Sequence, residues 1–176
     1  MRLGDRFVNG PNVSAETPDW SRETKRAFEW APSRALLASI RTYQRHMGKR
    51  GFFPVLIRKW AVLRHRFWST VTGADIPINS QLGGGLLIPH PNGIVIHPGA
   101  VVGPNCLLFQ QVTIGGGSGD GGTPVLEGHV DVGAGAKILG RVKIGKHAKV
   151  GANAVVLQDV PPGATAVGVP ARVLSG

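Results

Sequence analysis

Large aliphatic residues recur at every sixth position over residues 76–156 of this 176-residue chain. The pattern is clearest from Ile96 to Ile114, where Val102 and Leu108 keep the same phase. A period of six is neither the 3.6 of an α-helix nor the 2 of a simple strand. A short fixed repeat of this kind is typical of chains that stack their repeats on one another.

The sequence predicts a parallel β-helix built from hexapeptides. One branched side chain per hexapeptide points inward, three hexapeptides make a coil, and coils stack about 4.8 Å apart. Glycines after the aliphatic residues provide the backbone angles of the corners. The expected interior residues are Ile76, Leu82, Ile88, Ile96, Val102, Leu108, Ile114, Leu126, Val132, Ile138, Ile144, Val150 and Val156.

Two interruptions of the period are predicted to carry function. Two extra residues must be absorbed around Pro91 and Asn92 before Ile96 resumes the phase. The glycine-rich stretch 115–125 has Asp120 where an inward aliphatic residue is due, so it is predicted to be a loop leaving the coil or a distorted corner. Glycine-rich excursions from a rigid scaffold are common places for binding.

The basic charge of the chain lies in its N-terminal part. Before residue 71, 14 Lys and Arg face five Asp and Glu, whereas the remainder has six against five. We therefore predict a basic helical segment over 1–72, a β-helix domain over 73–160 and a C-terminal tail over 161–176. No long uncharged apolar run indicates a membrane span, and the first residues do not resemble a signal peptide.

Two helices are predicted in the N-terminal segment. The pattern from Ser21 to Met47 is helical, with Ser33 as N-cap after Pro32, and a second helix runs from Pro54 to about Thr70. The second helix has an apolar stripe beside basic residues. It either packs on the β-helix or a neighbouring subunit, or rests on anionic lipid as a peripheral contact. No nucleic-acid motif accompanies the charge, so a nucleic-acid partner is not expected.

The single cysteine, Cys106, allows no internal disulfide, which fits a cytoplasmic protein. Its position inside the repeat favours a small packed residue over a nucleophile. His97, His129 and His147 are expected at outward turns. No metal site is predicted.

Several motifs resemble those of serine acetyltransferases and of related enzymes that O-acetylate sugars in exopolysaccharide pathways. They include TGADIPI, IPHPNGIVI, QQVTIGG, VGAGAKILG and VGVPARV, and the resemblance covers residues 72 to 174. It implies a left-handed parallel β-helix of hexapeptide repeats with a small helical segment before it. It also implies acetyl-CoA as co-substrate and a homotrimer with active sites between neighbouring subunits.

The resemblance places the general base on His90, in IPHPNG, and an orienting carboxylate on Asp75, in TGADI. Histidine suits this role because its ordinary pKa is near neutrality. The carboxylate would fix the imidazole tautomer and stabilise the imidazolium. Judged without the family, His90 would be an ordinary exposed corner histidine.

The family binds CoA in a groove between subunits, largely through backbone groups. By motif, this groove falls on Ala134 and Gly135 in GAGAK and on Lys149 and Ala152 in AKVGA, with Arg172 in GVPAR beside the phosphates. The alternative for Lys149 and Arg172 is an ordinary solvated charge.

The chain differs from serine-specific members at the positions that bind the ammonium and the carboxylate of serine. Pro89 replaces an aspartate before the base, and Gly122 and Thr123 replace an Arg-His pair before Pro124. The lost arginine would have gripped a carboxylate. The sequence therefore predicts an acetyl-CoA-dependent O-acetyltransferase acting on a small-molecule or lipid-linked hydroxyl acceptor, in first place a sugar of an exopolysaccharide intermediate. It is expected in the cytoplasm or at the inner membrane face. L-Serine is the alternative acceptor, and a non-catalytic trimeric scaffold is the second alternative.

Overall fold

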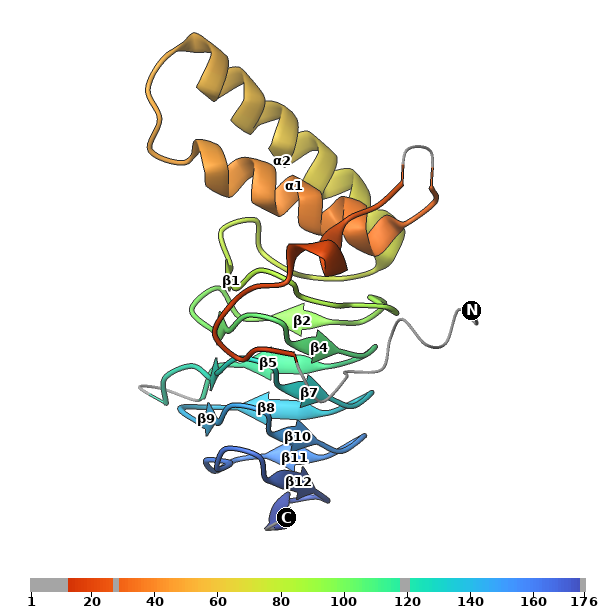
Figure 1. The fold of residues 1–176 in the computed structure, drawn as a ribbon, viewed down its shortest axis with the longest axis vertical. Helices are drawn as coiled ribbons and strands as arrows, with labels where there is room; N and C mark the ends of the chain where they lie inside the picture. Colours follow the sequence, from red (N-terminus) through yellow and green to blue (C-terminus); the bar gives the residue numbers. More distant parts are fainter. Residues whose placement is uncertain (1–12, 27–28, 118–120, 175–176) are drawn as a thin grey trace.

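The computed structural model describes residues 13–26, 29–117 and 121–174. A tapering stack of coils carries a pair of helices at one end and the C-terminus at the other (Figure 1). The architecture is the predicted left-handed parallel β-helix with an N-terminal helical segment.

Three sheets form the faces of the stack. Face 1 contains β1 (Gln81–Leu82), β3 (Val101–Val102), β6 (Val125–Leu126) and β9 (Lys143–Ile144). Face 2 contains β4 (Leu107–Leu108), β7 (Asp131–Val132), β10 (Lys149–Val150), β12 (Thr165–Val167) and β13 (Arg172–Leu174). Face 3 contains β2 (Val95–Ile96), β5 (Thr113–Gly115), β8 (Lys137–Leu139) and β11 (Val155–Val156).

The six-residue period fills the interior as predicted. Every aliphatic residue of the predicted set is buried, and so are the small residues Ala100, Ala136, Ala148 and Ala154. Stacked strands pair in parallel with inward residues in register, for example Ile96 on Ile114 and Ile114 on Ile138. Each aliphatic side chain therefore packs between equivalents one coil above and one coil below.

Both interruptions of the period are where the sequence places them. Leu87 pairs with Leu107 and Val95 with Thr113, so the upper coil takes eight positions where the lower one takes six. The two extra residues lie in the turn around Pro91. The glycine-rich segment leaves the wall between β5 and β6, and Gly117 N–H donates to Gly122 O at 3.0 Å where it returns. It is therefore a loop, one of the two forms expected; Asp120 lies outside the described residues.

The helices differ from the prediction at their starts. Residues Trp20–Glu23 form a 3-10 helix, α1 spans Pro32–His46 and α2 spans Phe52–Thr72. The predicted N-cap at Ser33 is wrong, because Pro32 occupies the first helical turn and Ala31 is the N-cap. Proline suits that position because it lacks an N–H, and it keeps the preceding residue out of the helical region.

Helix α1 covers the open upper end of the β-helix (Figure 1). Its residues Leu36, Leu37 and Ile40 are buried in one core with the aliphatic side chains of the coils. Helix α2 packs on α1 and is fastened to the first coil by His65, whose Nε2 lies 2.8 Å from Ile76 O. Neither described helix is long and apolar enough to cross a bilayer.

An N-terminal strap, residues 13–23, runs along the wall. Buried Asn105 holds it: the side-chain oxygen accepts from Asp19 N–H at 2.8 Å, and the amide donates to Ser14 O and Thr17 O at 2.8 Å. Ala15 O lies so close to Gly128 that any side chain there would collide with it. The sequence did not predict this strap.

The last strands continue face 2 past residue 160, where the broken period predicted the end of the repeat. β12 pairs in parallel with β10, and β13 folds back antiparallel on β12. The described part of the C-terminal segment is thus attached to the β-helix as an extension of face 2.

A buried ion pair joins the strap, α1 and the first coil. Arg41 Nη2 lies 2.8 Å from Glu23 Oε1, and both side chains are 9% exposed. Arg41 also donates to Leu82 O and Gly83 O, each at 2.6 Å. The guanidinium therefore provides hydrogen-bond donors to two carbonyl groups at the open edge of the coil.

We expect Arg41→Ala to lower the free energy of unfolding by about 3–5 kcal/mol, because it leaves the Glu23 carboxylate buried without its partner. Urea denaturation followed by circular dichroism measures this change. Arg45→Ala, at an exposed position of the same helix, is the control and should change stability by less than about 0.5 kcal/mol. Equal effects of the two substitutions would contradict the role of the pair.

Candidate active site

The parallel strands of face 2, β4, β7, β10 and β12, end at one edge of the prism, and the turns that follow the first three stack into a column. We call Gln110, Ala134 and Ala152 the corner column; each is two residues past the end of its strand, in β4, β7 and β10. Gly135 N–H donates to Gln110 O at 2.9 Å and Asn153 N–H to Ala134 O at 2.8 Å. These bonds hold the three turns in register.

The corner column contains backbone donors that no described residue accepts from. Among the described residues, the N–H groups of Ala134 and Ala152 have no protein acceptor. Ala152 is exposed and Ala134 is half-buried. Gly135 has a φ of 73°, and a side chain there would collide with the Asn153 amide. The turns thus form a shallow strip with polar backbone on a rigid support.

His90 lies at the upper end of this strip. Counting from the pairing of Leu87 with Leu107, it occupies the corner position above Gln110. Its side chain is exposed, in the turn that holds the two extra residues. With coils about 4.8 Å apart, His90 is roughly 10 Å along the stack from Ala134.

Asp75 lies on the upper edge of face 3, the face that follows this corner. Its N–H donates to Ile94 O at 2.8 Å, its carbonyl accepts from Ile96 N–H at 3.0 Å, and it pairs with Val95. Its carboxylate is exposed, and within the described part of the chain no hydrogen bond or ion pair joins it to His90. The two residues share one end of the stack without a hydrogen bond or ion pair between them among the described contacts, so the dyad stays a prediction.

The two predicted phosphate-binding cations lie on face 2, below His90. Lys149 is exposed on β10 and Arg172 is exposed at the start of β13. β12 pairs with both of these strands. All five predicted cofactor residues therefore belong to face 2 or to the turns at its edge, although no contact made by them with a ligand is part of the structure.

The glycine-rich loop returns to the wall beside Gly99. Thr123 Oγ1 donates to Gly99 O at 2.9 Å, and Gly99 N–H donates to His97 Nδ1 at 3.1 Å. His97 is exposed, as predicted, and its ring lies beside Gly116 at the start of the loop. Thr123 therefore has a structural role in closing the loop.

Sequence reasoning missed Arg141 at this loop. Gly122 has a φ of 65°, and a side chain there would come within 2.9 Å of Arg141 Nε. A guanidinium from the coil below thus packs beside the residues that replace the family's Arg-His pair. Nothing in the local sequence signals this contact, because it joins the loop to a residue of the following coil.

A cleft of about 220 Å³ lies between the start of α1 and the first coil. Pro89, the residue before His90, is part of its lining, together with Trp30 and the basic residues Arg22 and Arg34. The cleft therefore borders the turn that carries the candidate base.

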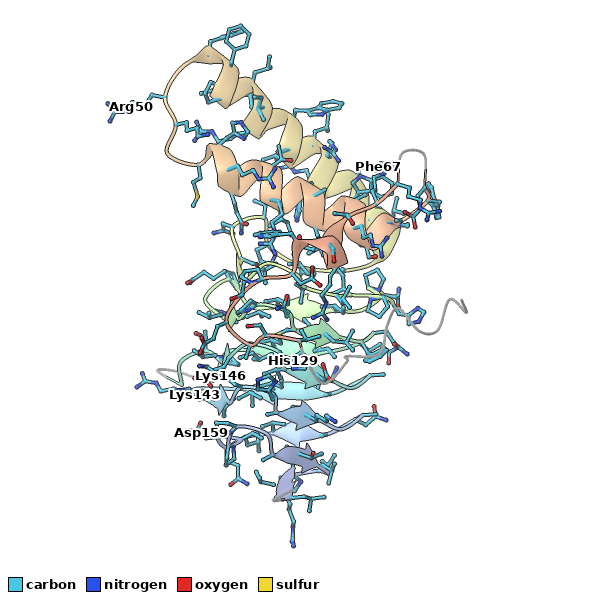
Figure 2. All side chains as sticks on the ribbon, viewed as in Figure 1. Arg50, Phe67, His129, Lys143, Lys146 and Asp159 are labelled. Atoms are coloured by element: carbon cyan, nitrogen blue, oxygen red, sulfur yellow. The ribbon has the colours of Figure 1, made fainter. Side chains whose placement is uncertain are left out.

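The remaining candidate groups have structural explanations. Burial raises the pKa of the Cys106 thiol to about 12, so this residue is a packed side chain as predicted. His129, labelled in Figure 2, meets His147 of the next coil edge to face, with their Nδ1 atoms 2.7 Å apart. Within the described residues, no group of three or more His, Cys, Asp or Glu is arranged to hold a metal ion.

Comparisons with known proteins agree in sequence and in structure. A serine acetyltransferase of Synechococcus elongatus is 46% identical over 106 residues, which cover 59% of this chain and 43% of that protein. Soybean serine acetyltransferase complexed with serine matches with a TM-score of 0.65 at 37% identity, over 81% of this chain and 56% of that one.

Over the matched residues, this chain is related to serine acetyltransferases. A serine acetyltransferase in complex with CoA also matches, with a TM-score of 0.67 at 34% identity over 82% of this chain and 58% of that one. The predicted resemblance to this family of hexapeptide-repeat acyltransferases is confirmed. The chain spans less than half the length of the curated serine acetyltransferases that it matches. No family model matches it.

The histidine pair predicts a pH-dependent stability. The pKa of His129 is lowered, first by burial and also by the neighbouring His147, while Asp131 opposes the shift. A histidine with a lowered folded pKa binds fewer protons when folded, so the free energy of unfolding should fall as pH drops below about 6.5. His129→Asn, which tolerates the φ of 56° at this position, should reduce that dependence in urea titrations between pH 7.5 and 5. An unchanged pH profile would contradict the assignment.

Proposed function

We propose that this chain is an acetyl-CoA-dependent O-acetyltransferase with L-serine as its acceptor. The observation that supports it best is the corner column. His90 takes the corner position above Gln110, and the turns of Ala134 and Ala152, whose N–H groups have no acceptor among the described residues, follow one and two coils below Gln110. Acyl transfer from acetyl-CoA requires a base close to the thioester and a site for the extended pantetheine arm. The corner column offers such a site, with His90 at one end. The serine acetyltransferases that the chain resembles add independent support.

His90 acts as the general base. It accepts the proton of the acceptor hydroxyl while that oxygen attacks the thioester carbonyl, and the C–S bond breaks as the ester C–O bond forms. The imidazolium then returns its proton to the departing CoA thiolate. Asp75 is a positioning residue that fixes the imidazole tautomer and stabilises the imidazolium.

The groove for acetyl-CoA uses the strip and a second copy of the chain. The N–H groups of Ala134 and Ala152 suit the amide carbonyls of the pantetheine arm, while Lys149 and Arg172 suit its phosphates. An open strip on one chain buries only one side of such a ligand. We therefore infer that a neighbouring subunit provides the other wall, in a homotrimer.

Arg141 supports serine as the acceptor. The chain lacks the loop arginine that would bind the serine carboxylate, but the guanidinium of Arg141 lies against Gly122 at the same loop. A bidentate pair between guanidinium and carboxylate is among the stronger polar contacts in proteins. Serine, which the sequence left as the alternative, thereby takes precedence over the sugar acceptor.

A sugar hydroxyl is the second candidate acceptor. Pro89 cannot bind the ammonium group of an amino acid, and it lines the 220 Å³ cleft next to the base. The cleft offers apolar and cationic side chains to a group larger than serine.

His90→Ala is expected to lower kcat by about 10² to 10⁴ because it removes the proton acceptor. Thiol release from acetyl-CoA with a turnover-competent acceptor measures the rate. His147→Asn, at an exposed corner, is the matched control and should keep wild-type kcat. Near wild-type kcat in the His90 variant would exclude it as the base, and failure to bind CoA in calorimetry would favour the non-catalytic scaffold.

Arg141→Ala is expected to raise KM for L-serine about tenfold or more, with a smaller change in kcat, because a charge-assisted pair is lost. The same assay should be run with serine and with nucleotide-linked and lipid-linked sugars. Arg141→Lys should recover part of the affinity. Saturable turnover of a sugar but not of serine would overturn serine and establish the second candidate.

A further inference from the structure

The solvent side of α2 is an apolar stripe along the whole helix. We call it the outer face, and its residues are between 41% and 75% exposed. Their spacing of three and four residues from Leu56 onward places them on one side of the helix. The outer face consists of Phe52, Phe53, Leu56, Trp60, Leu63, Phe67 and Val71.

The opposite side of α2 already has its packing partners. Ala61 and Thr72 are buried, Trp68 packs against the core, and His65 contacts the Ile76 carbonyl. These residues are also three and four apart. Figure 1 shows α1 between α2 and the coils along most of the length of α2. The outer face is therefore directed away from the β-helix.

Positive charge surrounds the outer face. Residues 32–72 contain nine Lys and Arg and no Asp or Glu. Projected around the helix at 100° per residue, Lys59 and Arg66 fall along one border of the stripe and Arg64 along the other. Arg50 lies in the turn that joins the helices, at the tip of the hairpin (Figure 2).

We propose that the outer face of α2 binds to the surface of an anionic lipid bilayer. Apolar side chains would enter the boundary between headgroups and acyl chains, and the bordering cations would meet lipid phosphates. A 21-residue helix lying in the plane provides a contact roughly 30 Å long.

The charge also argues against a second copy of this hairpin as the occupant. Two outer faces placed together would bring Lys59, Arg64 and Arg66 against their own copies, with no carboxylate of residues 32–72 to compensate them. Like charges at close range are destabilising. An anionic surface satisfies the apolar stripe and its basic borders together.

Vesicle flotation tests the proposal on the full chain. The probes are vesicles of phosphatidylcholine with phosphatidylglycerol at a three-to-seven ratio, and vesicles of phosphatidylcholine alone. We expect the protein to float with the anionic vesicles, to stay unbound with the neutral ones, and to be released as salt is raised to about 0.5 M, where charge attraction is screened.

One substitution on the outer face and one at its border test the apolar and the electrostatic contributions to lipid binding. Leu63→Glu and the charge reversal Lys59→Glu should each lower the partition coefficient about tenfold or more. Leu157→Glu, at a residue of similar exposure on the β-helix, should leave it unchanged. Circular dichroism verifies that each variant keeps its fold, which the exposure of these positions favours.

Sedimentation of the protein without vesicles tests the alternative that a second copy of the chain covers the outer face. No binding to anionic vesicles, or binding that Leu63→Glu leaves intact in folded protein, would overturn the proposal. Dissociation of an assembly by Leu63→Glu, together with absence of vesicle binding, would identify a second copy as the occupant. None of these readouts requires turnover, so the result does not depend on the proposed acetyl transfer.

Discussion

Stacking of one branched side chain per hexapeptide is the interaction on which the rest of this structure depends. Ile96, Ile114 and Ile138 illustrate it, since each lies in register with the next and is excluded from water. A shift by one residue would turn each such side chain outward, so the register of every coil is strongly specified. The corners, in contrast, add only small interior residues such as Ala100 and Ala136, and their exposed side chains can vary. Chemistry can therefore be built at the corners without loss of the core.

The candidate site follows from this division. Ala134 and Ala152 occupy equivalent turns because their strands are in register, and their free N–H groups consequently align. His90 stands in the turn where two additional residues interrupt the period. The glycine-rich loop forms where another six residues are added, between β5 and β6. A rigid repeat thus fixes the distances between elements that do not themselves repeat.

The fold was predictable because its information is local: one aliphatic residue in six, from Ile76 to Val156, suffices to indicate the coils. The start of α1 was not predictable in the same way. Ser33 is a good N-cap residue, but Pro32 takes the first helical position. Contacts between distant segments left no pattern either, as with Asn105 and the strap or Arg141 and Gly122. The candidate base came from a motif, and its relation to the corner column came only from strand pairing.

Helix α1 covers the wide end of the β-helix, and the antiparallel β13 ends face 2 at the narrow end. A stack of parallel coils would otherwise present unpaired backbone donors and acceptors at each end, which is the arrangement through which cross-β assemblies recruit further chains. Arg41 occupies two such carbonyl groups on the first coil. The same side chain that joins strap, helix and coil thus also removes two acceptors with which another chain could pair at this end.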